Sequence, residues 1–274
     1  MRRAEWINLF FFSLFIALAW RHPSTKRQRK DVTTIGAIGI SLILAVQVLS
    51  DALALFSTSV LRDWLPAPLM LMVYWQAGRF FRQPNEQLQT KLEELDQKLL
   101  GAILSNRTTS RKHGWVASYL EIAYLFCYAL VPLGIAVLYF MHLGHYADRY
   151  WTTVLPPTYL CYAFLPFVQT LPPRMLARDR DFSALPSKTR KLNLWILRYL
   201  SIQVNTFPSA HVASTMAASL ALLRLVPLAG AIFLWVSISI AAGAVMGRYH
   251  YTADAFTAAA LAVAVFLVEA LFLH

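Results

Sequence analysis

Two short segments in the C-terminal part of the chain, residues 205–211 and 247–254, carry residue types that could perform chemistry. Each places a histidine, His211 or His250, at the start of a long apolar run. One apolar stretch separates the two segments, and it contains a turn signal at Pro227. Two antiparallel helices joined at this turn would return the second histidine to the level of the first. We therefore predict that both histidines belong to one active site.

His250 and Asp254 are four residues apart, so they share a face if a helix begins near His250. A carboxylate beside an imidazole fixes the tautomer through one ring nitrogen and leaves the other free to attack an electrophile. The spacing is also compatible with a purely structural His–Asp cap. An idle buried aspartate is expensive at the start of a membrane helix, which favours the catalytic interpretation.

Ser209 is a plausible N-cap for the helix that contains His211. The free amides of a helix N-terminus form an anion site, and a histidine in the first turn could give a proton to a bound anion. The alternative is a simple capped helix start. Two arginines favour the anion: Arg174 follows two rigid prolines at the end of another apolar run, and Arg248 lies two residues before His250. Guanidinium groups match phosphate oxygens, so these residues together predict a phosphate site.

The composition indicates an integral membrane protein. Of the 274 residues, 58% are hydrophobic and only 14% are charged, and the mean hydropathy is +0.49. We expect an all-α, polytopic membrane fold of about eight helices. The net charge of +11 does not indicate nucleic acid, because the basic residues lie between apolar runs, where a bilayer surface or a phosphate-bearing lipid is the better partner. Cys127 and Cys161 fall inside apolar runs and are predicted to be free, inert thiols. No metal or cofactor is implied, since the sequence has no clear ligand cluster.

Loop charge orients the spans. Of the 25 Lys and Arg residues, 20 fall on one side of the predicted membrane topology, so the positive-inside rule makes that side, which also carries both histidine segments, cytoplasmic. The first run has no small-residue cleavage site and is expected to be a retained anchor. The apolar runs predict eight spans, near residues 5–20, 34–58, 64–78, 115–141, 150–171, 209–224, 227–247 and 252–273.

Residues 83–104 place leucines at helical spacing in a charged segment, which fits either an amphipathic helix on the membrane or bundle, or a solvated connector. Three acidic residues fall within predicted spans: Asp51, Glu121 and Glu269. Acidic residues are costly there and carry information. Glu121 could pair with an arginine of the site or reach the interface.

In order and placement, Phe207-Pro208-Ser209-Ala210-His211 and His250-Tyr251-Thr252-Ala253-Asp254 resemble the motifs of the type 2 phosphatidic acid phosphatase (PAP2) superfamily. The resemblance implies a six-helix catalytic core within residues 63–274, after N-terminal membrane helices in residues 1–62. It implies that His250 is a nucleophile that becomes transiently phosphorylated, that Asp254 orients it, and that His211 protonates the leaving oxygen. Arg174, Ser209 and Arg248 would then hold the phosphate.

The chain departs from that pattern at four positions. Phe167 stands where the family has a lysine, Met175 replaces the proline after the first arginine, Ala210 replaces glycine, and Ala244 occupies the place of the usual arginine before His250. The segments Pro172-Pro173-Arg174 and Arg248-Tyr249-His250-Tyr251 resemble a divergent branch that includes inositol-phosphoceramide-synthase-like proteins.

The resemblance implies a membrane lipid phosphatase, which would hydrolyse a lipid phosphate monoester or pyrophosphate through a phosphohistidine. We expect it in a bacterial inner (plasma) membrane, with the site on the cytoplasmic face. The alternatives are a lipid phosphotransferase with an alcohol acceptor, a transporter that uses the intramembrane acids, and a catalytically inactive scaffold.

Overall fold

The computed structural model describes residues 1–53, 56–109, 114–176 and 188–272, and in these ranges the chain is all-α, as predicted. Two short 3₁₀ turns, η2 (Gly144–Tyr146) and η3 (Pro173–Met175), interrupt the α-helices. The α-helices are α1 (Arg3–Arg21), α2 (Lys26–Leu53), α3 (Phe56–Trp64), α4 (Pro66–Gly78), α5 (Glu86–Thr109), α6 (Gly114–Leu125), α7 (Cys127–Phe140), α8 (Ala147–Phe164), α10 (Lys188–Leu200), α11 (Ala210–Leu225), α12 (Pro227–Met246) and α13 (Thr252–Phe272).

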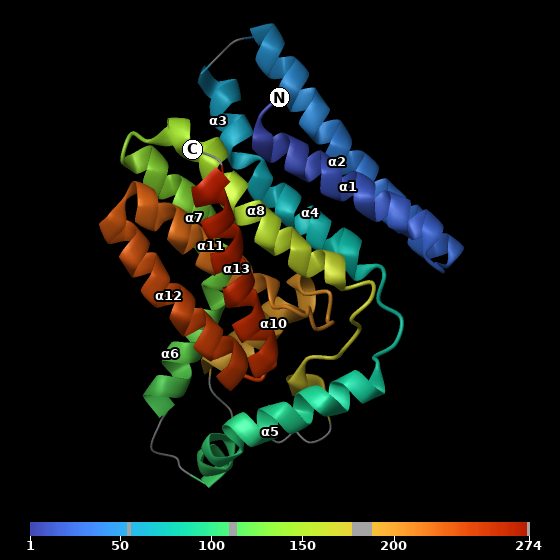
Figure 1. Cartoon of the computed structure of the whole chain (residues 1–274), viewed down its shortest axis with the longest axis vertical. Helices are drawn as coiled ribbons and strands as arrows, with labels where there is room; N and C mark the ends of the chain where they lie inside the picture. Colours follow the sequence, from blue (N-terminus) through green and yellow to red (C-terminus); the bar gives the residue numbers. More distant parts are fainter. Residues whose placement is uncertain (54–55, 110–113, 177–187, 273–274) are drawn as a thin grey trace.

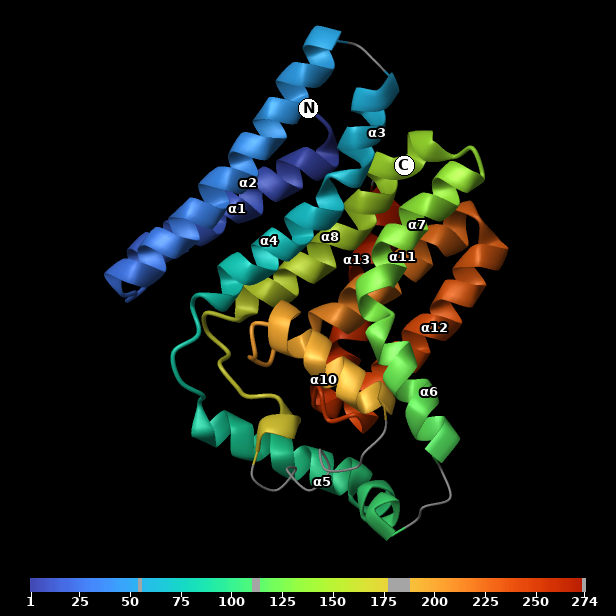
Figure 2. The same ribbon diagram turned by 180° about the vertical axis from the view of Figure 1, so that it is seen from behind.

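Helix α11 lies at the centre of the bundle, packed against α7, α8, α12 and α13. Helices α1 and α2 pair with each other on one side, where they contact α4 and α1 also contacts α8 (Figure 1). Helix α5 crosses one end of the bundle, and both chain termini lie toward the opposite end (Figures 1 and 2). The two ends of the bundle are therefore built differently, and only one of them is covered by a helix that lies across it.

The turn at Pro227 joins α11 and α12 as an antiparallel hairpin, which confirms the sequence prediction. Small residues let the two helices approach closely. A Cβ atom on Gly230 would lie 2.2 Å from the Cα and the backbone nitrogen of Leu223 in α11. Since those are backbone atoms, they cannot move aside as a side chain would. The close approach of α11 and α12 therefore requires glycine at position 230.

Length and hydropathy identify four helices that could cross a membrane, α1, α2, α12 and α13, and a fifth span if the bent pair α6 and α7 is counted as one. The remaining predicted spans coincide with α4, α8 and α11, which do not meet this criterion. Helices α4 and α11 have 13 and 16 residues. The predicted spans at residues 64–78 and 209–224 are thus short helices, and α8 is less apolar than a typical spanning helix. The reason is that α11 and α8 are surrounded by other helices, so they need not be uniformly apolar or long.

The predicted separation of charge agrees with the fold. The basic segments after α1, around α5, in α10 and before α13 all lie toward the end of the bundle that α5 crosses (Figures 1 and 2). Helix α5 itself settles the question left open for residues 83–104, because it buries Leu92 and Asp96 at 5% and 1% exposure and contacts α13. It is an amphipathic helix on the bundle rather than a solvated connector.

We predict that Gly230→Ala lowers the apparent melting temperature of the purified protein, because overpacking a close helix contact costs about 1–3 kcal/mol. The matched control is Gly101→Ala in α5, where the nearest atom to a new Cβ is the flexible Gln97 side chain at 3.6 Å. Replacing this helical glycine should be neutral or slightly stabilising. Equal melting temperatures for the two variants would contradict the close contact between α11 and α12.

Candidate functional site

The hairpin brings the two predicted catalytic histidines together. His211 lies in the first turn of α11, and His250 lies in the short turn between α12 and α13. Their ring centroids are 5.9 Å apart, with the ring planes at 75°. The separation leaves one histidine able to act on an atom that is bound to the other. This agrees with the geometry expected from the sequence.

Asp254 lies behind His250, in the first turn of the following helix, α13. The Nδ1 atom of His250 is 3.3 Å from Oδ2 of Asp254, which also accepts a hydrogen bond from the backbone N–H of Tyr251 at 3.0 Å. Asp254 is fully buried, and its backbone carbonyl accepts from the N–H of Ser209 at 3.1 Å. The start of α13 is therefore tied to the start of α11. Because Nδ1 faces the carboxylate, Nε2 is the ring nitrogen of His250 that remains for a ligand.

Ser209 is the N-cap of α11, as predicted, and its hydroxyl accepts from the N–H of Val212 at 3.5 Å. Arg174 lies in η3, and its backbone N–H donates to the carbonyl of Arg248 at 2.9 Å. Its guanidinium is 3.5 Å from the carbonyl oxygen of Tyr249. The prolines before Arg174 thus hold it against the turn that carries His250.

Arg248, the other predicted phosphate contact, pairs with an acidic residue of α5. Its Nη1 atom donates to Oδ2 of Asp96 at 2.6 Å, and both side chains are buried. The second oxygen of Asp96 accepts from the backbone N–H of Thr252 at 2.8 Å, at the start of α13. In this arrangement Arg248 attaches α5 to the site. A contact between Arg248 and phosphate stays a prediction.

Aromatic side chains that the sequence analysis did not single out surround His211. The centroids of Tyr128, Tyr124 and Tyr74 lie 5.4, 6.0 and 6.4 Å from its ring. The hydroxyl of Tyr128 is buried without a hydrogen-bond partner among the described residues. Tyr124 and Tyr128 are four residues apart on either side of the bend between α6 and α7. Their four-residue spacing could have indicated that both tyrosines face the same neighbour, but tyrosines in apolar runs are usually core residues.

A buried polar cluster packs against the turn between α12 and α13. Glu121 of α6 accepts from Arg190 at 2.8 Å, from the amide of Asn193 at 2.6 Å and from the hydroxyl of Tyr249. Arg190 also donates to the carbonyl of Gly247 at 2.7 Å. Through these bonds α6 and α10 fix the backbone on the N-terminal side of His250. We call Glu121, Arg190, Asn193 and Tyr249 the Glu121 cluster.

Glu121 thus pairs with an arginine, as the sequence suggested, but that arginine is Arg190 and not one of the predicted phosphate ligands. The other acidic residues predicted within spans have different surroundings. Asp51 is exposed and accepts from Gln47 at 2.6 Å, whereas Glu269 is buried and accepts from Thr153. Neither lies among the contacts of the histidine pair described above. The sequence analysis missed Arg190 because it lies in a basic segment that was interpreted as a topological signal.

Burial lowers the pKa of His250 from its ordinary value of 6.5 to about 3, and the charge of Arg174 acts in the same direction. Because this pKa is far below 7, the imidazole of His250, which lies in the turn between α12 and α13, is neutral over the physiological pH range. A neutral imidazole is the nucleophilic form.

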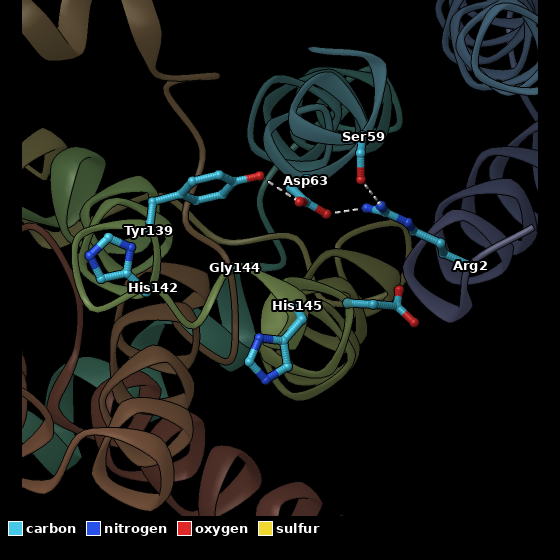
Figure 3. Close-up of a pocket in the computed structure, with 8 residues that line it drawn as sticks. Arg2, Ser59, Asp63, Tyr139, His142, Gly144 and His145 are labelled. Carbon is cyan, nitrogen blue, oxygen red and sulfur yellow. Dashed lines mark hydrogen bonds and ion pairs between the residues drawn. The ribbon is translucent and has the colours of Figure 1, made fainter. Parts of the chain in front are cut away.

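A polar pocket of about 460 Å³ lies beside the N-terminus, at the end of the bundle opposite α5, and Figure 3 shows the side chains that line it. Its centre is Asp63, which accepts from Arg2 and, at 2.6 Å, from the hydroxyl of Tyr139. The backbone carbonyl of Asp63 accepts from the indole of Trp151 at 2.7 Å. Asp63 of α3 thus links Arg2 at the N-terminus to α7 and α8. His142 and His145 also line the pocket, but in the described part of the chain no group of three or more His, Cys, Asp or Glu side chains could hold a metal ion.

Comparison with known families agrees with the placement of the two histidine motifs. A PAP2 superfamily model matches residues 90–268, which is more than half of the chain and includes every predicted site residue. The protein therefore belongs to the PAP2 superfamily, and this membership supports a phosphatase-type phosphoryl-transfer function. No curated protein and no solved structure matches the chain. The resemblance to inositol-phosphoceramide-synthase-like proteins and the N-terminal boundary of the catalytic core, predicted at residue 63, stay predictions.

We predict that Glu121→Gln strongly destabilises the protein. Removing one partner of a buried ion pair leaves the other charge uncompensated, which costs about 3–5 kcal/mol. Thermal unfolding in detergent measures the loss. The control is Glu94→Gln in α5, which removes an exposed carboxylate of the same kind and should change the melting temperature little. A similar small change in both variants would contradict the structural role of the Glu121 cluster.

The lowered pKa of His250 gives a pH dependence of stability. The unfolded chain binds a proton at this residue near pH 6.5, whereas the folded chain binds it only near pH 3. Protonation therefore favours the unfolded state, and this contribution to stability falls as the pH drops from about 6.5 to about 3. We expect His250→Asn to lose less stability over this range than the wild type does. Parallel pH–stability curves for the two proteins would contradict a neutral, buried His250.

Proposed function

We propose that the protein is a membrane lipid phosphatase that hydrolyses a phosphate monoester or pyrophosphate through a phosphohistidine on Nε2 of His250. The observation that carries this proposal is the alignment of Asp254, His250 and His211, in which the carboxylate is 3.3 Å from Nδ1 and the second imidazole lies 5.9 Å from the first between centroids. Membership in the PAP2 superfamily supports the same class of reaction.

In the first step, Nε2 of His250 attacks the phosphorus atom and the bond from phosphorus to the leaving oxygen breaks. His211 gives a proton to that oxygen, and the negative charge of the bound phosphate favours the protonated form of His211 beforehand. Asp254 stabilises the positive charge that develops on the His250 ring. The product alcohol, or phosphate monoester from a pyrophosphate, then leaves.

In the second step, His211 accepts a proton from a water molecule, and the resulting nucleophile attacks the phosphohistidine. The P–N bond breaks, inorganic phosphate forms and His250 returns to its neutral state. The guanidinium of Arg174 and the N-terminus of α11, capped by Ser209, contribute positive potential to the phosphoryl oxygens in both steps.

A lipid is the substrate class that the position of the site favours. His211 begins α11, and His250 joins two helices that are each long and apolar enough to span a bilayer, so the site lies at a membrane boundary. A phosphate at this depth belongs to a head group whose apolar chain remains in the bilayer. The concentration of basic residues at this end favours the cytoplasmic face of a bacterial inner membrane.

We predict that His250→Asn abolishes phosphate release from lipid phosphates in detergent with chelator present, and that His211→Asn lowers the rate by a factor of about 10²–10⁴, the usual contribution of general acid–base catalysis. The control is His145→Asn at the opposite end of the bundle, which should retain full activity. Full activity in both site variants would contradict the proposed mechanism.

Labelled substrate tests for the phosphohistidine, and an added alcohol distinguishes hydrolysis from phosphoryl transfer. With labelled substrate, the wild type should form an acid-labile, base-stable phosphoenzyme that is absent from His250→Asn. If an added alcohol captures the label as a new ester while free phosphate falls equally, the protein is a phosphotransferase with the same intermediate. If the wild type releases phosphate at its normal rate but never carries the label, the reaction does not pass through a phosphohistidine.

A further inference from the structure

A second cavity, of about 360 Å³, lies between the C-terminal ends of α4 and α10. Its walls combine aromatic rings, a hydroxyl and a guanidinium, a mixture suited to an amphipathic ligand. The lining residues are Trp75, Gly78, Arg79, Tyr199, Ser201 and Ile202.

The segment that follows α10 is fixed to the last turn of α4. The indole N–H of Trp75 donates to the carbonyl of Leu200 at 3.2 Å, and the hydroxyl of Tyr74 accepts from the N–H of Ile202 at 3.0 Å. A Cβ atom on Gly78 would lie 2.5 Å from the side chain of Ile202. Hydrogen bonds between side chains and backbone groups, together with close packing, hold the two walls of the cavity in place. Tyr74 also lies beside His211, so one side chain contacts both the cavity wall and the histidine pair.

The cavity lies near the ends of two helices that are long and apolar enough to span a bilayer. The backbone carbonyl of Arg79 accepts from Gln28 at 2.9 Å, and its guanidinium is 3.8 Å from Asp31. Both partners are near the start of α2, a helix long enough to span a bilayer. At its other end, α10 is bonded through Arg190 to Gly247, where the spanning helix α12 stops. Helix α10 therefore runs between the ends of two spans, at the end of the bundle that carries α5 (Figure 2).

Apolar surface approaches the cavity along α4. Pro68, Leu71, Trp75 and Arg79 recur at helical spacing, so they follow one side of the helix, and none of them is buried. This stripe ends in the guanidinium of Arg79. Its order, apolar residues first, then an indole, then a cation, follows the order of acyl chain, interface and phosphate in a lipid leaflet.

Helix α10 continues this surface. Its buried side carries Arg190, Asn193 and Leu197, whereas Trp195 and Tyr199 on the outer side are 61% and 66% exposed. Exposed aromatic residues of this kind are typical of membrane interfaces. Lys191, Leu192 and Arg198 are also exposed on α10, so this surface carries apolar, aromatic and basic side chains together.

The cation in the cavity can accept an anionic partner. The side chain of Arg79 is 51% exposed, and its pair with Asp31, itself 35% exposed, is long. Exposed pairs of this kind contribute little to stability, because water and salt screen the two charges. A phosphate oxygen could therefore share or replace Asp31 at little cost, and guanidinium forms two-point hydrogen bonds with phosphate.

We propose that this cavity binds the head group of an anionic phospholipid of the surrounding bilayer. The phosphate lies on Arg79, the glycerol region lies between Trp75 and Tyr199, and an acyl chain follows Leu71 and Pro68 along α4. The site is separate from the histidine pair and does not depend on the proposed phosphatase reaction.

Native mass spectrometry of the purified full-length protein in detergent, with phosphatidylglycerol or phosphatidylcholine added, tests this proposal. The wild type should retain phosphatidylglycerol about tenfold more tightly than Arg79→Gln does, since a hydrogen bond to a charged group contributes about 1.5–3 kcal/mol. Arg27→Gln is the matched control: it removes an exposed arginine from the same end of the molecule without touching the cavity and should behave as wild type. Asp31→Asn should tighten retention, because it removes the competing carboxylate.

Three results would overturn the proposal. The first is equal retention by Arg79→Gln and Arg27→Gln, which would reduce the effect to overall charge. The second is no preference of the wild type for phosphatidylglycerol over phosphatidylcholine. The third is displacement of the lipid by water-soluble glycerol phosphate at equal concentration, which would exclude a role for the apolar stripe. Since the readout is lipid retention, failure here leaves the phosphatase proposal intact, and an inactive protein can still bind the lipid.

Discussion

The turn between α12 and α13 is the constraint on which the site depends. It must end one spanning helix, start another and carry His250 at a fixed height, although its surroundings offer little water to its backbone groups. The buried carboxylate of Glu121 meets this need by accepting from three side chains, one of which also bonds the carbonyl of Gly247. In an apolar environment an unpaired carboxylate would be costly, so the Glu121 cluster forms as a unit or not at all.

Two helices that do not span the bundle complete the same end of the molecule. From α10 come Arg190 and Asn193, which satisfy Glu121 beneath the turn. From α5 comes Asp96, which bonds Arg248 before His250 and the N–H of Thr252 after it. The backbone on both sides of His250 is therefore held by elements whose sequences are charged and amphipathic rather than apolar. This explains why a membrane protein keeps such segments packed against its bundle, with Asp96, Arg190 and Asn193 as buried contacts.

Sequence patterns predicted the parts of this structure that follow from local chemistry. Apolar runs located the helices, Pro227 located the hairpin, and the four-residue spacing of His250 and Asp254 predicted their contact. The partners of Glu121 and Arg248 could not be predicted in this way, because Arg190 and Asp96 approach from distant helices whose orientation is set by packing. The low hydropathy of α8 and the shortness of α11 have a related reason: both helices pack against several others in the bundle, where the bilayer does not set their length or polarity.

The absence of the family's usual arginine at position 244 has a structural counterpart. Ala244 is fully buried against Tyr124 and Tyr249, whose rings stack in parallel with centroids 4.0 Å apart. A guanidinium at this position would have to displace that stack. The same Tyr249 ring instead lies under two arginines from other elements, Arg190 at 5.1 Å and Arg174 at 5.5 Å from its centroid. The tyrosine stack and the arginines around it therefore form one arrangement, in which cationic side chains reach the turn from α10 and η3 rather than from the helix that precedes His250.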